Sequence, residues 1–335
     1  MHSHEPQLPE ARGPLSASVL DHLRGTGPLP PPGDIAGSPA YGDDLQLALY
    51  LCYELHYRGF AGVPPDPEWD PELLRTRAAL EDRFLTALRA DATVHQGVDE
   101  ALAGLLVEPV DGTGVSHFLR DKGELWQLRE YAAQRSLYHL KEADPHAWVL
   151  PRLRGRAKAA MAAVEFDEYG GGRAERLHAQ LFADLMTDLG LDTTYGRYLD
   201  AARAELLATV NLMSLFGLHR ALRGALVGHF ATVEITSSPG SRRLAEAMRR
   251  TGAGPAAEHF YDEHVEADAV HEQVVRHDVI GGLLEDEPHL ERDIAFGVDA
   301  TEFLEDRLGE ALLAHWREGR SSLRTPLSPE LTHVP

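Results

Sequence analysis

The sequence predicts an all-α protein. Apolar residues recur at helical spacing along most of the chain, and segments rich in proline and glycine separate these helical patterns. No stretch alternates strictly between apolar and polar residues, and none is rich enough in β-branched residues to indicate a sheet. We therefore expect a single helical bundle with roughly eight or more helices.

The expected helices follow one another with short connections. They cover residues 45–55, 71–88, 98–107, 122–142, 151–168, 178–189, 200–233, 241–251, 255–279 and 287–316. We expect residues 1–40, which are rich in proline and glycine, to be mobile or draped over the surface without packing a core. One helical domain then spans residues 41–320, and a polar tail covers 321–335.

Capping residues and breakers set the ends of these helices. Asp43 or Asp44 can cap the first helix. A helix must end before Pro145, because proline disfavours helical conformation in the residue preceding it, whereas Pro151 can open the next one. That helix either continues through the three glycines at 170–172 to about residue 189, at a cost of about 1 kcal/mol per glycine, or breaks there.

The composition excludes several classes of protein. With 32 Lys and Arg against 53 Asp and Glu, the net charge of −21 argues against nucleic acid or an anionic membrane as a partner. The chain has no run of about 20 apolar residues, and its N-terminus lacks the features of a secretory signal. We therefore expect a cytoplasmic protein. Because Cys52 is the only cysteine, a metal would be held by nitrogen and oxygen.

The segment from His264 to His271 carries the clearest chemical pattern. His264, Asp268 and His271 stand at i, i+4 and i+7, so on a helix they share one narrow stripe. Two imidazoles and a carboxylate suit iron, manganese or zinc. An acidic, solvated helix face with chance histidines is the alternative, since the chain holds 18 His and 53 acidic residues.

Further candidate ligands lie upstream. Glu175 and His178 form a Glu-x-x-His pair, and Glu168 precedes His178 by a spacing near three helical turns. Glu234 lies among β-branched residues at the end of an apolar segment, where an isolated ionised carboxylate would be costly. Glu234 is therefore paired, at the surface or bound to metal, and ordinary ion pairs remain an alternative for each of these residues.

The order of these residues resembles that of the haem-oxygenase-like di-iron oxidase and oxygenase family, the iron-containing redox enzymes of bacterial specialised metabolism. The resemblance covers roughly residues 122–280 and is strengthened by the segments 142–146, 168–172 and 215–226. It implies a haem-oxygenase-like bundle with additional N-terminal helices. The ligands it implies are Glu142, Glu168, His178, Glu234, His264, Asp268 and His271, with Glu175 as the substitute for Glu168 if the glycines break the helix.

The same resemblance implies the chemistry. It indicates two iron ions that cycle between Fe²⁺ and Fe³⁺, O₂ as co-substrate and an external electron donor. Two ferrous ions would balance the four negative charges of Glu142, Glu168, Glu234 and Asp268, and a neutral cluster can be buried in a bundle. Manganese would satisfy this balance as well as iron.

The expected reaction is the N-oxygenation of a small amine or amino acid, which Glu142 favours as the extra carboxylate of N-oxygenating members. Desaturation or C–C cleavage of an aliphatic amino acid or fatty acid is the alternative reaction. A non-catalytic iron-binding helical protein and a metal-free interaction protein are the alternatives from other classes. Arg220, Arg223 and Tyr169 are weaker candidates for substrate binding, and a homodimer is compatible with the sequence.

Overall fold

The computed structural model describes residues 5–93, 95–107 and 112–327. Every regular element in these ranges is a helix, so the predicted all-α class is confirmed. The first half of the chain forms α1 (Pro14–Leu23), α2 (Pro32–Ala36), α3 (Asp43–Glu54), α4 (Pro71–Asp91), α5 (Val98–Ala103), α6 (Val115–Asp121), α7 (Leu125–His139), α8 (Asp144–Ala147) and α9 (Gly155–Glu168). The second half forms α10 (His178–Asp188), α11 (Ala204–Leu218), α12 (Arg223–Thr251), α13 (Pro255–Val274), α14 (Gly281–Asp286) and α15 (Glu291–Arg317).

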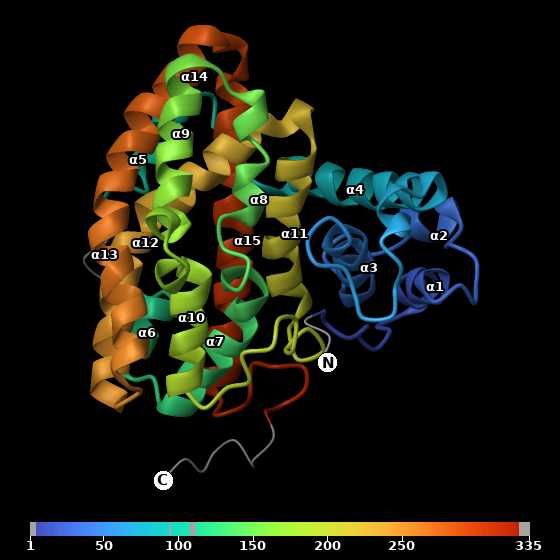
Figure 1. Ribbon diagram of the computed structural model, residues 1–335, viewed down its shortest axis with the longest axis horizontal. Coiled ribbons are helices and arrows are strands. Elements are labelled where there is room, and N and C mark those ends of the chain that lie inside the picture. The colour runs from blue at the N-terminus through green and yellow to red at the C-terminus, as the bar shows by residue number, and fades with distance from the viewer. Residues whose placement is uncertain (1–4, 94, 108–111, 328–335) are drawn as a thin grey trace.

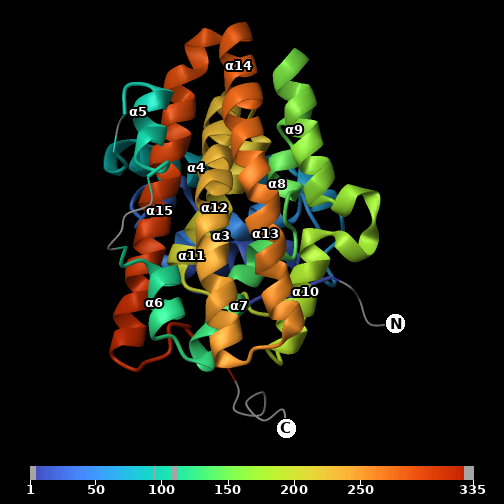
Figure 2. The ribbon, with the colours of Figure 1, turned by 90° about the vertical axis from the view of Figure 1, so that its left-hand side faces the viewer.

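The long helices form an elongated bundle, and α1 to α4 project from one of its sides (Figure 1). Helix α12 packs against both α13 and α15, which flank it in the perpendicular view of Figure 2. A π-helical turn at Val275–Ile280 joins α13 to α14, so helical structure is continuous from Pro255 to Asp286. None of the described helices combines the length and apolar character needed to cross a membrane.

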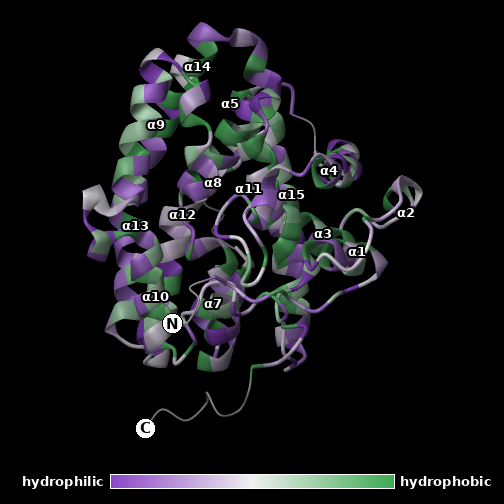
Figure 3. Cartoon of the chain, turned by 45° about the vertical axis from the view of Figure 1, so that its right-hand side comes forward, coloured by the Kyte–Doolittle hydropathy of each residue, from purple (hydrophilic) through white to green (hydrophobic). Residues whose placement is uncertain are grey.

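Helix α11 joins the N-terminal helices to the bundle. Every residue from Leu206 to Gly217 is buried, as expected of a helix that is apolar on all sides. One side of α11 packs against α3, whose residues from Leu45 to Glu54 are also buried, and another packs against α15. The mostly green ribbon around α3 in Figure 3 shows the hydrophobic character of this junction.

The N-terminal segment packs more extensively than the sequence predicts. Leu15, Val19 and Leu23 recur every four residues on α1 and are buried, so the expectation that residues 1–40 pack no core was wrong. The carboxylate of Asp44 accepts hydrogen bonds from the backbone N–H groups of Leu15 and Ser16 at the start of α1. This cap from a distant residue cannot be read from local sequence.

The beginning of the predicted tail is also packed. Ser322 and Leu323 are buried, and Ser322 donates both its backbone N–H and its hydroxyl to a carboxylate oxygen of Glu130. Residues 328–335 of the tail, like residues 1–4, lie outside the described ranges.

Two predicted boundaries around α12 were wrong. The single helix expected over 200–233 is divided between α11 and α12, and the guanidinium of Arg152 donates to the carbonyl oxygens of Gly217 and Leu218 at the end of α11. The turn expected at 237–241 is helical, because α12 continues through Pro239. Packing against α13 and α15 offsets the backbone hydrogen bond that proline removes.

Candidate metal centre

Helix α13 presents the predicted stripe to the interior of the bundle. His264, Asp268 and His271 are 6%, 2% and 2% exposed, so the alternative of a solvated acidic face is wrong for these three side chains. Their backbone is helical throughout, as the spacing predicts. The remaining predicted ligands reach this stripe from other elements.

Two groups of buried nitrogen and oxygen atoms meet at the stripe. The first, here called the Glu142 group, contains Glu142, His178 and His264, and the second, the Glu168 group, contains Glu168, Asp268 and His271. Within each group, one potential ligand atom per residue lies within 4.8 Å of the others. Both groups are entirely buried.

The two groups are adjacent. His178 Nδ1 lies 2.7 Å from Glu168 Oε2, and the rings of His178 and His264 are 4.4 Å apart between centroids. Glu234, on α12, joins the Glu168 group through a distance of 3.2 Å between its Oε2 and Nδ1 of His271. All seven predicted ligands therefore converge on one region of the bundle.

The glycine segment lets Glu168 and His178 meet. Helix α9 ends at Glu168, the chain turns through 170–172, and α10 begins at His178, so the continuous helix considered from the sequence is wrong and the break is what forms. Gly170 has a φ of 68°, and a Cβ there would lie 2.6 Å from the carbonyl carbon of Arg176. Only glycine fits this close reversal.

The break does not bring Glu175 into the site. Glu175 is exposed in a short 3₁₀ turn and belongs to neither group, whereas Glu168 remains next to His178. The glycines do break the helix, as the prediction for Glu175 required. The prediction that Glu175 would then replace Glu168 as a ligand was wrong.

Several potential metal-binding atoms of this region have charged neighbours but no hydrogen-bond partner in suitable geometry. The unpartnered buried atoms are Glu142 Oε2, His178 Nδ1, Glu234 Oε2, His264 Nε2, Asp268 Oδ2 and His271 Nδ1. Each such group costs about 1–3 kcal/mol when it is buried without a partner. Cations bound between the groups would turn these atoms into ligands, so the residues fit a pair of metal ions such as iron.

The buried groups of this region shift one another's pKa values. Burial lowers the pKa of His264, but the carboxylates of Glu142, Asp268 and Glu168 together outweigh burial and raise that pKa to about 10. Burial likewise opposes the charge on His271, yet Asp268 and Glu234 raise its pKa to about 11. Burial, reinforced by the charge of Asp268, raises the pKa of Glu234 to about 8. Without metal, bound protons offset the repulsion between the potential ligands of this region.

Neighbouring groups orient the imidazoles. His264 Nδ1 lies 2.7 Å from the carbonyl oxygen of Phe260 and donates to it, which leaves Nε2 free for a ligand. His271 Nε2 lies 3.3 Å from Asp167 Oδ2, which leaves Nδ1 facing the Glu168 group. Asp167 was not among the residues predicted from the sequence for this site.

Two more residues at this site were not among the predicted ligands. His139 Nδ1 lies 2.8 Å from Glu142 Oε1, and the i, i+3 spacing of the two residues was the available signal. Glu165 is 2% exposed, and neither of its carboxyl oxygens has a partner. Burial, with the charge of Glu168 next, raises the pKa of Glu165 to about 9.

A cavity of about 360 Å³ adjoins the Glu142 group. Glu142, His264 and His139 form part of its wall, whereas none of the residues of the Glu168 group lines it. A ligand in this cavity would therefore meet a metal held by the Glu142 group first. The volume suits a small molecule.

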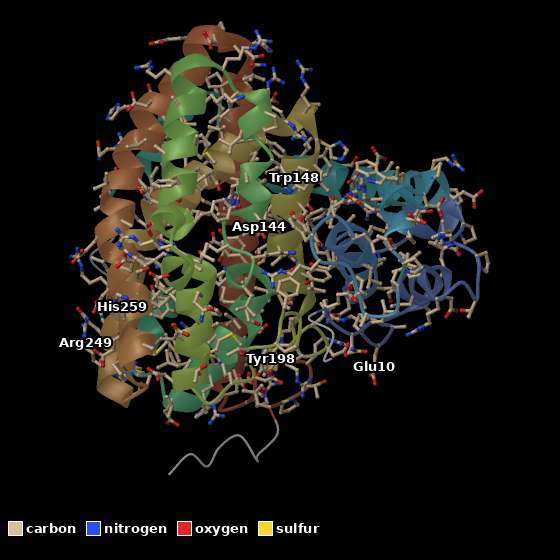
Figure 4. All side chains as sticks on the ribbon, viewed as in Figure 1. Glu10, Asp144, Trp148, Tyr198, Arg249 and His259 are labelled. Atoms are coloured by element: carbon tan, nitrogen blue, oxygen red, sulfur yellow. The ribbon has the colours of Figure 1, made fainter. Side chains whose placement is uncertain are left out.

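The residues predicted to bind substrate lie elsewhere. Arg220 is exposed, Arg223 forms an ion pair with Glu287, and none of the three predicted residues lines the cavity beside Glu142. The hydroxyl of Tyr169 donates to Asp144 Oδ1 at 3.0 Å. Tyr169 lines a separate cleft with Asp144 and Trp148, which are labelled where the bundle faces the N-terminal helices in Figure 4.

Comparison with known proteins agrees with this geometry. The sequence profile of a family described as iron-containing redox enzymes matches residues 129–306, a range that contains all seven predicted ligands. The chain is also similar to nitrosourea synthase from Streptomyces achromogenes subsp. streptozoticus, with 25% identity over 146 residues. The matched stretch covers 44% of this chain and 31% of that protein. The chain thus matches about a third of the length of this relative.

Proposed function

The chain belongs to the family of iron-containing redox enzymes, and on this premise we propose that it is a non-haem di-iron oxygenase that N-oxygenates a small amine or amino acid. The observation that carries the proposal is the pair of adjacent, fully buried donor groups, one of which lines a cavity. The similarity to a nitrosourea synthase supports oxidation at nitrogen, since a nitrosourea contains an oxidised nitrogen atom. O₂ would be the co-substrate, and a separate reductant would supply electrons.

The residues of the chain have distinct parts in this proposal. Iron held by the two groups would supply the chemistry of O₂ reduction. Glu142 and His264 would present that chemistry to the cavity, while Asp268 and His271 would hold the second ion behind it. The buried carboxyl of Glu165 keeps a proton three residues before Glu168, where it does not add a fifth negative charge to the four of the predicted carboxylate ligands.

Metal stoichiometry and O₂ consumption test the proposal together. Protein loaded anaerobically with Fe²⁺ should hold up to two ions per chain, and O₂ uptake should rise with amines or amino acids whose products gain oxygen at nitrogen. A product that has lost hydrogen or carbon would support the alternative of desaturation or C–C cleavage. Iron binding without substrate-dependent O₂ uptake would support a non-catalytic iron-binding protein.

Substitution of one predicted ligand, compared with an exposed control, tests whether that residue binds iron. His271→Ala should abolish tight binding of at least one iron ion, because it removes the Nδ1 atom that faces Glu168, Glu234 and Asp268. His259 is exposed on α13 and is labelled on the outer side of the bundle in Figure 4, so His259→Ala is a matched control. Unchanged iron stoichiometry in His271→Ala would contradict the assignment.

A further inference from the structure

We infer that the cavity beside the Glu142 group selects a substrate with a second, cationic end, which Glu302 and Asp306 bind away from the reacting atom. The inference rests on the proposed function, since the Glu142 group defines where the substrate reacts. It adds a charge requirement and two residues that determine specificity.

The cavity has chemically different walls. Glu142, which follows α7, and His264 of α13 bring the candidate metal centre to one wall, and both carry buried donor atoms without partners. Glu302 and Asp306, one helical turn apart, come from α15. Figure 2 shows α13 and α15 on opposite sides of α12, and residues of both helices line the cavity.

The charges in the cavity wall do not balance at α15. Arg135 and Glu305 neutralise each other through a two-pronged ion pair, and Glu142 is assigned to metal. Glu302 and Asp306 also line the cavity, and in the described part of the chain no Lys or Arg lies within ion-pair distance of either. His95 acts on Glu302 electrostatically, but its imidazole is paired with Asp299. A cation of the substrate would compensate both carboxylates.

The surroundings of these carboxylates favour a bound cation. Glu302 is half-buried, and desolvation, with the charge of Asp306 next, raises its pKa above the ordinary value. Asp306 is more exposed than Glu302. An anionic group such as the carboxylate of a fatty acid would meet repulsion here.

The remaining walls indicate what joins the two ends of the substrate. Leu105 and Leu244 are aliphatic, and Tyr131, Phe260 and Tyr261 are aromatic. Aliphatic walls suit a methylene chain, and aromatic faces tolerate a neighbouring ammonium or guanidinium group. The substrate class is therefore an aliphatic amine with a second ammonium or guanidinium group, of which an α,ω-diamine is the simplest probe.

Binding to protein loaded with redox-inert Zn²⁺ tests this inference without turnover. Calorimetric titration should show that cadaverine binds and that pentanoate, a chain of similar length with the opposite charge, does not. Glu302→Gln and Asp306→Asn should each weaken cadaverine binding by about tenfold, because each removes a charge-assisted contact. Glu291→Gln, an exposed change on the same helix outside the cavity, should leave binding unchanged.

The possible failures are distinguishable. Unaltered cadaverine affinity in both cavity variants, tighter binding of pentanoate, or no binding of cadaverine to Zn²⁺-loaded protein would each overturn the inference. If the wild-type protein still consumed O₂ with another amine, the proposed function would stand. Conversely, if the protein consumed no O₂ with any amine tested, the proposed function would be contradicted. The measured binding preference of the cavity would still stand.

Discussion

At the scale of single residues, Glu142 shows how local conformation positions a candidate ligand. Helix α7 ends at His139, and Glu142 lies in the turn that follows, between His139 and His264. The next residue, Ala143, has a φ of 73°, which is the only positive φ of a non-glycine residue in the described ranges. Such a conformation costs about 1–3 kcal/mol and is retained where the surrounding structure imposes it.

His139 should position Glu142 for one metal ion. Its Nδ1 contacts Glu142 Oε1, while its ring stacks on Phe182 with centroids 4.6 Å apart. His139→Phe should keep the stacking, lose the hydrogen bond and weaken the affinity for one of two metal ions by roughly 10–100-fold. Titration with Mn²⁺ would measure this, with His259→Phe as the exposed control. Two unchanged binding constants would show that Glu142 needs no support from His139.

At the scale of elements, periodicity was sufficient for most of the long helices, but it missed the short helices α1, α2 and α6 and several helix ends. Apolar spacing predicted the segments that become α3, α4, α7, α13 and α15. The end of α11 depends on Arg152, and the continuation of α12 through Pro239 depends on packing against its neighbours. Both contacts join residues that are distant in sequence, so local patterns could not indicate them.

The candidate site also has parts that local sequence predicts and parts that it does not. The stripe of His264, Asp268 and His271 follows from helical spacing within α13, and the structure buries it as one face. Glu142 was expected at the site only through the family resemblance, whereas Glu234 was also a candidate from its β-branched, apolar surroundings in the sequence. The cavity could not be predicted, because its walls come from separate elements and its acidic residues stand far from the ligands in sequence. The assignment of all seven residues as ligands stays a prediction.

The turn between α9 and α10 allows an element-level test. Gly170→Ala would place a Cβ 2.6–2.8 Å from backbone atoms of Arg176 and Leu177 at a φ of 68°. It should lower the free energy of unfolding by about 2 kcal/mol or more and weaken metal binding, because Glu168 and His178 would be pushed apart. Urea unfolding and metal titration of the full chain would measure both effects.

Gly172→Ala is the matched control for this change. Gly172 has a similar φ of 79°, but its Cβ would meet only the Phe166 ring at 3.8 Å. This variant should show the conformational cost alone, about 1 kcal/mol, with metal affinity unchanged. Equal effects of the two substitutions on metal affinity would mean that the close reversal at Gly170 does not hold the ligands together.

At the scale of the whole molecule, the bundle buries an acidic centre in a chain that already carries a net charge of −21. In the metal-free protein, raised pKa values of about 10 for His264, about 11 for His271 and about 8 for Glu234 keep these groups protonated near neutral pH. Ligation by imidazole nitrogen and carboxylate oxygen requires the deprotonated forms. Metal binding and proton binding therefore compete at the same atoms.

Metal binding should consequently release protons, and affinity should rise with pH. The sign follows from the raised pKa values: lowering the pH favours the protonated, metal-free form, whereas raising it removes the competing protons. Near pH 7, up to about three protons should be released as both sites fill, one each from His264, His271 and Glu234. Calorimetry of Zn²⁺ binding in buffers of different ionisation enthalpy would count them. An affinity that stays constant between about pH 6 and pH 8 would show that protons do not occupy these atoms in the metal-free protein.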